Sequence, residues 1–351
     1  MKANIAHTDK QRVVIVGGGL GGLELASKLV DNDFQVVLID KNNYHQFPPL
    51  IYQVASAGLE PSSISFPFRR IFQGKDDFFF RMAKVEAVDT AAKKIQTSVG
   101  EIRYDYLVLA AGAKTNYFGN KDIEATTLPM KTVGEAMRLR NTILRNLEKA
   151  ETEDDPARKQ ALMNIVVVGG GASGVEIAGA VAEMKKNILE RDYPDLEASQ
   201  MHIYLVNAAD RLLSAMDPAS SARAERDLKG LHVHIRQPQF ATEYKDGILK
   251  TSAGLEIPAE TVIWVSGICA NTIEGLPKES IGHAGRILTD RFCRVKGLQD
   301  VYAIGDQSLI EGDKEYPLGH PQLAQVALQQ AKCVAHNLKN HKNQAGNPPN
   351  F

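Results

Sequence analysis

Residues 11–22 read QRVVIVGGGLGG, an apolar run that leads into a glycine-rich turn. The run is continuous and rich in β-branched residues, which is typical of a parallel strand buried on both faces. Gly17, Gly19 and Gly22 have the spacing that gives a tight turn, close approach to a pyrophosphate and close helix–strand packing. The apolar spacing of residues 23–32 predicts a helix, whose N-terminus would bind the phosphate.

A second strand follows this helix and ends in an acid. Residues 34–40, FQVVLID, end in Asp40, and a carboxylate at this position accepts hydrogen bonds from an adenosine ribose. The glycine pattern alone is a weak signal. Strand, glycines, helix, strand and terminal acid in this order predict a dinucleotide-binding unit.

The same pattern occurs a second time. Residues 164–174 read NIVVVGGGASG, with Gly169, Gly171 and Gly174 at the same spacing. The next predicted strand, residues 201–207, ends in Asn207, which can hydrogen-bond a ribose but does not repel a 2′-phosphate as a carboxylate does. Two sites in one chain suggest that FAD stays in the first while NADH or NADPH enters and leaves the second.

Glu176 lies two residues after the last glycine of the second pattern, in the first turn of the predicted helix. One interpretation is that its carboxylate stabilises the positive end of the helix dipole. The other is that it lies beside the nicotinamide end of the bound dinucleotide. The spacing alone does not favour either interpretation.

Two further strands complete the flavoprotein pattern. Residues 104–113, YDYLVLAAGA, end in small residues that include Ala111 and Gly112, and residues 300–306, DVYAIGD, end in Asp306. Both resemble strands of flavoproteins built like the disulfide reductases, in which the aspartate meets the flavin ribityl–pyrophosphate region. The expected fold class is α/β, with two Rossmann-like dinucleotide-binding domains.

The order of these motifs predicts discontinuous domains. Residues 1–120 and 285–340 would form the FAD-binding domain, residues 121–284 the NAD(P)H-binding domain, and residues 341–351 a polar tail.

Composition excludes several classes of protein. The 351 residues carry a formal net charge of −1, which argues against nucleic-acid binding. The sequence has no apolar run long enough to span a bilayer and no signal-peptide core. Its three cysteines, Cys269, Cys293 and Cys333, lie far apart in the sequence, so neither a disulfide framework nor a local redox dithiol is expected. We expect them to be core thiols, and we predict no metal site.

Residues 40–72 resemble the corresponding segment of type II NADH dehydrogenases, which are single-subunit NADH:quinone oxidoreductases that pump no protons. The matching residues are Asp40, Lys41, Asn42, Tyr44, His45, Phe47, Pro49, Leu50, Tyr52, Gln53, Val54 and Ala55. Residues 319–330, GHPQLAQVALQQ, resemble the quinone-site helix of that family. There the match comprises Ala324, Gln325, Ala327 and Gln329.

The resemblance implies a function in a respiratory chain. Hydride would pass from NADH to a non-covalently bound FAD, and two electrons would then reduce a membrane quinone, either menaquinone or ubiquinone. Glu176 would lie near the flavin and nicotinamide, while Gln53, Gln325 and Gln329 would line the quinone site. The remaining cofactor contacts would come from both glycine patterns, Asp40, Lys41, Ala111, Gly112, Asp306, Asn207, Ala324 and Gln325.

The resemblance also implies a location. Family members continue past this point with amphipathic helices that face a membrane, so we expect a peripheral protein on the cytoplasmic face of the cell membrane. A homodimer is compatible with this expectation. Without that segment, the present chain is expected to be soluble.

Two other functions stay open at this stage. The chain could be a soluble NAD(P)H-dependent flavoprotein that reduces another acceptor, such as a ferredoxin-like protein. It could also be a redox-sensing flavoprotein similar to apoptosis-inducing factor. In the soluble reductase, activity would depend neither on the length of the quinone side chain nor on Gln325→Ala. The redox sensor would turn over slowly with quinones.

Overall fold

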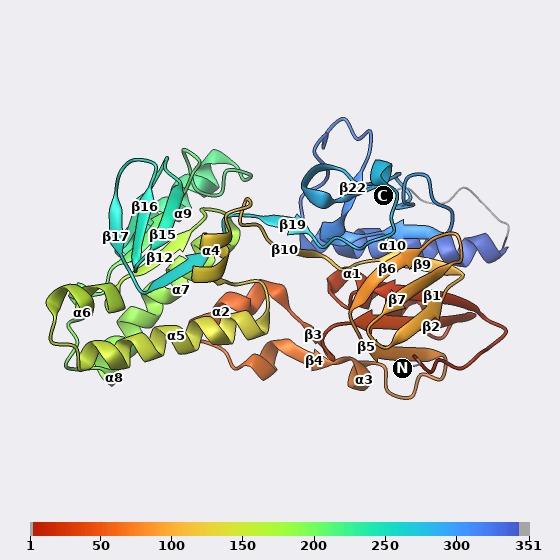
Figure 1. Ribbon diagram of the computed structural model, residues 1–351, viewed down its shortest axis with the longest axis horizontal. Coiled ribbons are helices and arrows are strands. Elements are labelled where there is room, and N and C mark those ends of the chain that lie inside the picture. Colours follow the sequence, from red (N-terminus) through yellow and green to blue (C-terminus); the bar gives the residue numbers. More distant parts are fainter. Residues whose placement is uncertain (1–2, 344–351) are drawn as a thin grey trace. The chain divides into compact units, whose positions relative to one another are not determined.

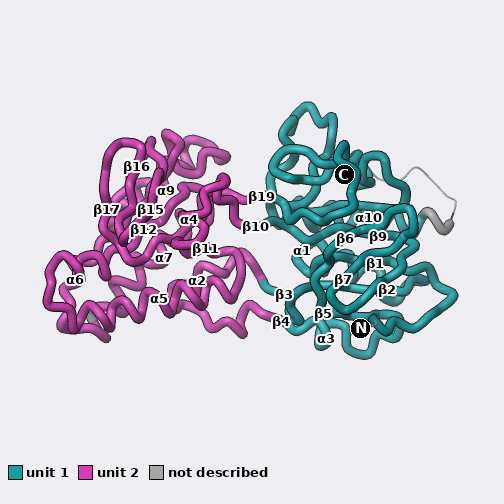
Figure 2. Tube along the Cα trace, in the orientation of Figure 1, with its two compact units in different colours: residues 1–46, 66–114, 269–351 teal, residues 47–65, 115–268 magenta. Residues whose placement is uncertain are grey.

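The computed structural model describes residues 3–343 of the chain. These residues divide into two compact units, shown in teal and magenta in Figure 2. Among the described residues, unit 1 comprises 3–46, 66–114 and 269–343, and unit 2 comprises 47–65 and 115–268. The division therefore falls after residues 114 and 268, where the sequence suggested 120 and 284, and the segment Phe47–Ser65 lies in unit 2.

Unit 1 is built on a five-stranded parallel sheet with the order β21-β9-β1-β2-β5. Its strands are β1 (Gln11–Val16), β2 (Phe34–Asp40), β5 (Phe78–Met82), β9 (Tyr106–Leu109) and β21 (Val301–Ala303). The chain moves outward from β1 in one direction to β2 and β5, and β9 then pairs with the other side of β1. Ligands bind where the strand order reverses in this way, beyond the carboxyl ends of the strands.

Two layers cover this sheet (Figure 1). On one face, α1 (Leu20–Leu29) packs against α10 (Ala324–Asn343), and Leu25, Leu29 and Leu338 share one fully buried cluster. On the other face, Ile95 and Ile102 of a three-stranded antiparallel sheet pack against β1 and β2. That small sheet consists of β6 (Val85–Asp89), β7 (Lys94–Thr97) and β8 (Gly100–Arg103).

Unit 2 repeats the same plan. Its five-stranded parallel sheet has the order β11-β18-β12-β13-β14, in which β12 takes the place of β1 and β13 the place of β2. The strands are β11 (Leu128–Pro129), β12 (Ile165–Val168), β13 (Ile203–Val206), β14 (Val233–Arg236) and β18 (Thr261–Trp264). A second antiparallel sheet, β15 (Ala241–Lys245), β16 (Ile248–Thr251) and β17 (Glu256–Pro258), packs on one face. Two Rossmann-like units confirm the predicted fold class.

Helices cover the opposite face of the unit 2 sheet. The short helix α2 packs against α5 and α7, and its Ile51 and Val54 enter their common core. α7 ends at Met184 and continues as a π-helical turn, Lys185–Leu189. The α-helices of unit 2 are α2 (Ile51–Ala55), α4 (Lys121–Thr126), α5 (Val133–Glu151), α6 (Pro156–Met163), α7 (Ala172–Met184), α8 (Glu190–Asp192) and α9 (Pro218–Gly230).

The remaining α-helix and strands are short. They are α3 (Phe68–Ile71) and the strand pairs β3 (Tyr44–Gln46) with β4 (Ser65–Pro67), β10 (Ala113–Thr115) with β19 (Ile268–Ala270), and β20 (Ile287–Thr289) with β22 (Ser308–Ile310). No helix among residues 3–343 is both long and apolar enough to cross a membrane. Of the predicted tail, residues 341–343 belong to α10 and residues 344–351 lie outside the described part.

Candidate functional site

The first glycine turn has the geometry of a phosphate-binding loop. Gly17 has a φ of +106°, and a Cβ there would lie 2.3 Å from the carbonyl oxygen of Ala110. A Cβ on Gly22 would lie 1.8 Å from the carbonyl oxygen of Gly17, so neither position accepts a side chain. A Cβ on Gly19, at the N-terminus of α1, would meet nothing within 4 Å. The open side of the turn therefore leaves room for a phosphate at a helix N-terminus.

Asp40 lies beside this turn at the end of β2. Its Oδ2 accepts a hydrogen bond from the N–H of Gly18 at 2.7 Å, and its Oδ1 accepts one from the N–H of Asn42 at 2.8 Å. Burial raises the pKa of the Asp40 carboxyl, while these two N–H groups act in the opposite direction. His45 Nδ1 contacts the carbonyl oxygen of Gly18 at 2.9 Å. The carboxylate is thus held in place where a ribose would bind.

The second glycine turn reproduces the first. Gly169 has a φ of +121°, and a Cβ there would lie 2.6 Å from the carbonyl oxygen of Val265. A Cβ on Gly174 would lie 1.7 Å from the carbonyl oxygen of Gly169, and one on Gly171 would meet nothing within 4 Å. Both turns therefore leave their open side at the middle glycine of the pattern.

A buried amide joins the two further loops of unit 1 that were predicted to contact the cofactor. The Gln307 side chain is fully buried and accepts a hydrogen bond from the N–H of Ala111 at 2.9 Å. It donates to the carbonyl oxygen of Asn271 at 2.7 Å, and Asn271 in turn donates to the carbonyl oxygen of Ala111 at 2.7 Å. The loops that carry Gly112 and Asp306 are thereby fastened together. Sequence reasoning missed Gln307 and Asn271, although Gln307 directly follows the Gly–Asp pair.

The predicted quinone-site helix is α10, and the glutamines in it and just before it have different roles. Gln325 and Gln329 are exposed, while Gln330 is buried and accepts a hydrogen bond from the N–H of Gly305 at 2.7 Å. Gln322 donates to the carbonyl oxygen of Asp306 at 2.9 Å. Two glutamines therefore hold the Gly305–Asp306 loop and two are free to face solvent. Ala324, the first residue of α10, is half-buried.

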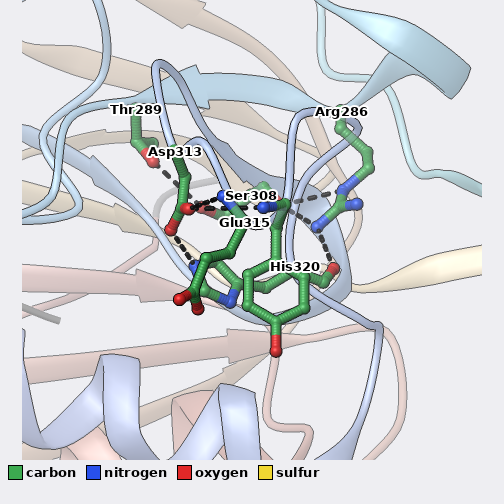
Figure 3. A network of polar contacts seen from close by, with 7 residues as sticks. Arg286, Thr289, Ser308, Asp313, Glu315 and His320 are labelled. Atoms are coloured by element: carbon green, nitrogen blue, oxygen red, sulfur yellow. Dashed lines mark hydrogen bonds and ion pairs between the residues drawn. The ribbon is translucent and has the colours of Figure 1, made fainter.

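Arg286 anchors the loop that precedes α10 (Figure 3). Its buried guanidinium donates to the carbonyl oxygens of Ser308, at 2.8 Å from Nε, and of His320, at 3.1 Å. His320 Nε2 lies 3.0 Å from Asp313 Oδ2. Burial lowers the pKa of Arg286, and the nearby carboxylate of Asp306 raises it. Arg286 thus links β22 to the segment that precedes α10, a role that the sequence did not indicate.

In unit 2, Glu176 lines a groove of about 690 Å³. The groove lies among α2, α7 and α9. Its lining also includes Tyr52 and Gln53 of α2, which belong to the segment that resembles type II NADH dehydrogenases. Burial raises the pKa of Glu176 even though its side chain still reaches solvent. The full lining is Tyr52, Gln53, Ser56, Gly58, Val175, Glu176, Gly179, Ala180, Glu183, Ser220, Arg223, Ala224, Asp227, Leu228 and Leu231.

The position of Glu176 corrects one expectation. α7 begins at Ala172, so Glu176 is its fifth residue and lies beyond the first turn, where it was expected. The dipole effect is confined to the first turn, so it does not explain this carboxylate. The structure brings Glu176 together with Gln53 in unit 2, while Gln325 and Gln329 belong to unit 1.

The cysteines form no disulfide. Cys293 and Cys333 are buried, as expected, whereas Cys269 is partly exposed. Although distant in sequence, Cys293 and Cys333 are hydrogen-bonded to each other, and this contact together with burial raises the pKa of Cys293. Among residues 3–343, no cluster of three or more His, Cys, Asp or Glu side chains could hold a metal ion.

Comparison with known proteins identifies the family. Residues 11–331 match the pyridine nucleotide-disulphide oxidoreductase family. The type II NADH:quinone oxidoreductase NdhA of Mycobacterium tuberculosis is 31% identical over 97% of this chain and 74% of its own length. This chain belongs to the type II NADH:quinone oxidoreductase family. The Ndh enzyme of the same organism is also similar, at 32% identity over 94% of this chain and 72% of its own length.

A solved structure agrees with this membership. NDH2 from Plasmodium falciparum in complex with NADH superposes with a TM-score of 0.88 over 97% of this chain and 86% of its own, at 20% identity. At that identity the likeness establishes the fold. Membership of the type II NADH:quinone oxidoreductase family accounts for the paired dinucleotide turns and confirms the family predicted from residues 40–72 and 319–330.

Proposed function

We propose that this chain oxidises NADH and passes two electrons to a membrane quinone through a non-covalently bound FAD. The observation that carries the proposal is the presence of two geometrically equivalent dinucleotide turns in one chain of the type II NADH:quinone oxidoreductase family. A bound flavin supplies the ability to accept a hydride and pass electrons on. The chain supplies position, orientation and charge.

Unit 1 would hold the FAD. The open turn at Gly19 fits a pyrophosphate at the N-terminus of α1, and the carboxylate of Asp40 fits the adenosine ribose. Lys41 follows Asp40 at the same edge of the sheet. Ala111, Gly112 and Asp306 would contact the remainder of the cofactor, in loops that Gln307 holds together.

Unit 2 would bind the nicotinamide nucleotide. The open turn at Gly171 fits its pyrophosphate, and Asn207 fits the adenosine ribose. Glu176 lies in the groove next to this turn, and burial raises its pKa, so its carboxyl can hold a proton more readily than a fully solvated one. We assign to it proton supply or control of the flavin–nicotinamide interaction.

Amide side chains would bind the quinone. Gln325 and Gln329 lie one helical turn apart and are both exposed, so they can donate to a quinone carbonyl. Gln53, the third amide predicted for the quinone site, lies in unit 2, in the groove that Glu176 also lines. Ala324 and Gln325, at the start of α10, would also meet the flavin. Either menaquinone or ubiquinone fits these donors.

The proposed setting is the cytoplasmic face of the cell membrane, where the protein would be attached peripherally and could form a homodimer. No proton would be pumped, because both half-reactions would occur on one side of the membrane. Such attachment is supported by family membership, since the substrate quinone resides in the bilayer.

The test is anaerobic spectroscopy of the purified chain. NADH should bleach the flavin absorbance, and a short-chain quinone should restore it. Gln325→Ala should raise the KM for quinone and leave the rate of flavin reduction by NADH unchanged. Bleaching that no quinone reverses would favour another acceptor, and slow turnover with a long-lived reduced complex would favour a redox sensor. A protein that takes up no flavin would refute the proposal.

A further inference from the structure

Asn207 occupies in unit 2 the position that Asp40 occupies in unit 1. The Oδ1 of Asn207 accepts a hydrogen bond from the N–H of Gly170 at 3.1 Å, as Oδ2 of Asp40 does from Gly18 at 2.7 Å. Both donors are the second of three consecutive glycines. Asp40 is the last residue of β2, and Asn207 directly follows β13; each of these strands pairs with the strand that leads into the glycine turn. The ribose-binding position of the second site is therefore a neutral amide.

The loop after Asn207 is shaped around that amide. The Nδ2 group of Asn207 donates to the carbonyl oxygens of Ala209 and Arg211, each at 3.1 Å. The second oxygen of an aspartate would face these same two carbonyl oxygens with no donor between them. The corresponding oxygen of Asp40 instead accepts from the N–H of Asn42 at 2.8 Å. One loop presents N–H groups to a carboxylate, and the other presents C=O groups to an amide.

Backbone hydrogen bonds hold Asn207 in this orientation. Its N–H donates to the carbonyl oxygen of Arg236, and its own carbonyl oxygen accepts from Gln239, both at 2.9 Å. The N–H of Leu213 donates to the carbonyl oxygen of Gly170 at 2.8 Å, which closes the loop over the glycine turn. Asn207 is only 7% exposed. Rotating its amide by 180° would break its hydrogen bonds to Gly170, Ala209 and Arg211.

Charged groups near this position are mixed. Arg211 follows in the loop and donates to the carbonyl oxygens of Ser214 and Met216, and Arg236 ends the neighbouring strand. Asp210 is exposed in the loop directly before Arg211, and the Glu225 side chain accepts a hydrogen bond from Gln237 at 3.3 Å. No carboxylate takes the place at the glycine turn that Asp40 takes in unit 1, because Asn207 fills it.

We propose that the second dinucleotide site accepts NADPH as well as NADH. The inference rests on the proposed function, since it concerns the nucleotide that reduces the flavin. A 2′-phosphate carries a charge of about −1.5 to −2 at neutral pH, and a carboxylate at the ribose position would repel it. Asn207 brings no such charge, and its Oδ1 has a second lone pair that accepts the 2′-hydroxyl of NADH. The same residue therefore tolerates both nucleotides.

The experiment compares the two nucleotides on the flavin-loaded full chain, by stopped-flow bleaching of the flavin without oxygen. For the wild type, the second-order rate constants with NADPH and NADH should agree within about tenfold. Asn207→Asp should lower both values, because its second oxygen faces two carbonyl oxygens, but the NADPH value should fall at least about tenfold further than the NADH value. Ala253→Asp is the matched control, because it adds the same charge to an exposed turn of unit 2 and should leave the ratio unchanged.

Each outcome has one meaning. If NADH bleaches the flavin and NADPH is slower by about 1000-fold or more, the inference is wrong while the proposed function stands. If neither nucleotide bleaches a flavin-loaded chain, the proposed function itself fails. An equal loss with both nucleotides in Asn207→Asp would make Asn207 a structural residue only. If that variant does not fold, the wild-type ratio decides alone.

Discussion

The buried glutamine of α10 offers a sharp test of how the cofactor loop is held. Gln330→Met keeps the length of the side chain but removes the oxygen that accepts the hydrogen bond from Gly305 at 2.7 Å. Gly305 has a φ of +71° and precedes Asp306, the residue proposed to contact the flavin. Without the glutamine, the Gly305 N–H loses its acceptor and the loop loses its tie to α10.

The magnitude follows from the burial of that N–H. A buried polar group left without a partner costs about 1–3 kcal/mol, and because Gly305 is half-buried the lower part of that range, about 1–2 kcal/mol, applies. For a folding unit of this size, each kcal/mol shifts the Tm by about 2–4 °C. The flavin-loaded variant should therefore melt about 2–8 °C below the wild type, and its Kd for FAD should rise.

The assay is thermal unfolding of the flavin-loaded protein, followed by flavin fluorescence, with a titration of FAD into the stripped protein. Gln329→Met is the matched control, because Gln329 is the preceding residue of the same helix but is exposed. The control should change neither the Tm nor the FAD affinity, although it should weaken quinone reduction. A Tm within about 1 °C of the wild type for Gln330→Met, or an equal loss in the control, would refute the reasoning.

Three other variants test other parts of the chain. Gly174→Ala places a Cβ 1.7 Å from the carbonyl oxygen of Gly169, so the second turn must open; the protein should keep its flavin but lose its bleaching by NADH, and normal bleaching would contradict this. Glu176→Gln removes a carboxyl whose pKa is raised by burial. Because the folded state then favours the protonated form, the wild type should lose stability relative to the variant as pH rises through that raised pKa. Parallel plots of Tm against pH from about pH 4 to 7 would speak against this. Arg286→Met leaves the carbonyl oxygens of Ser308 and His320 without their donor, so the free energy of unfolding should fall by about 2–3 kcal/mol in urea titrations; a change below about 0.5 kcal/mol would show that the anchor is dispensable.

The residues of each glycine turn determine that turn by themselves. Gly17 and Gly169 have a positive φ, and a Cβ on Gly22 or Gly174 would meet the carbonyl oxygen of the glycine five residues earlier, so these constraints lie within the turn. The strands on either side of each turn were predictable because their apolar runs are continuous, which is typical of buried parallel strands. The fold class and the family therefore followed from the sequence.

The assignment of Phe47–Ser65 to unit 2 was decided by tertiary packing. Ile51 and Val54 are buried against α5 and α7, helices that begin far downstream, so nothing near Gln53 in the sequence indicates its partners. The groove that Gln53 shares with Glu176 depends on that packing.

The supports of the cofactor loops were likewise decided by the tertiary structure. Gln307, Arg286 and Gln330 hold backbone groups through hydrogen bonds to segments that only the folded chain brings near. The same holds for the loop carbonyls that surround the amide of Asn207. The backbone dihedrals of a glycine turn are set by the residues of the turn and can be predicted from the sequence. The partner of a buried polar group depends instead on which distant segments the fold brings together.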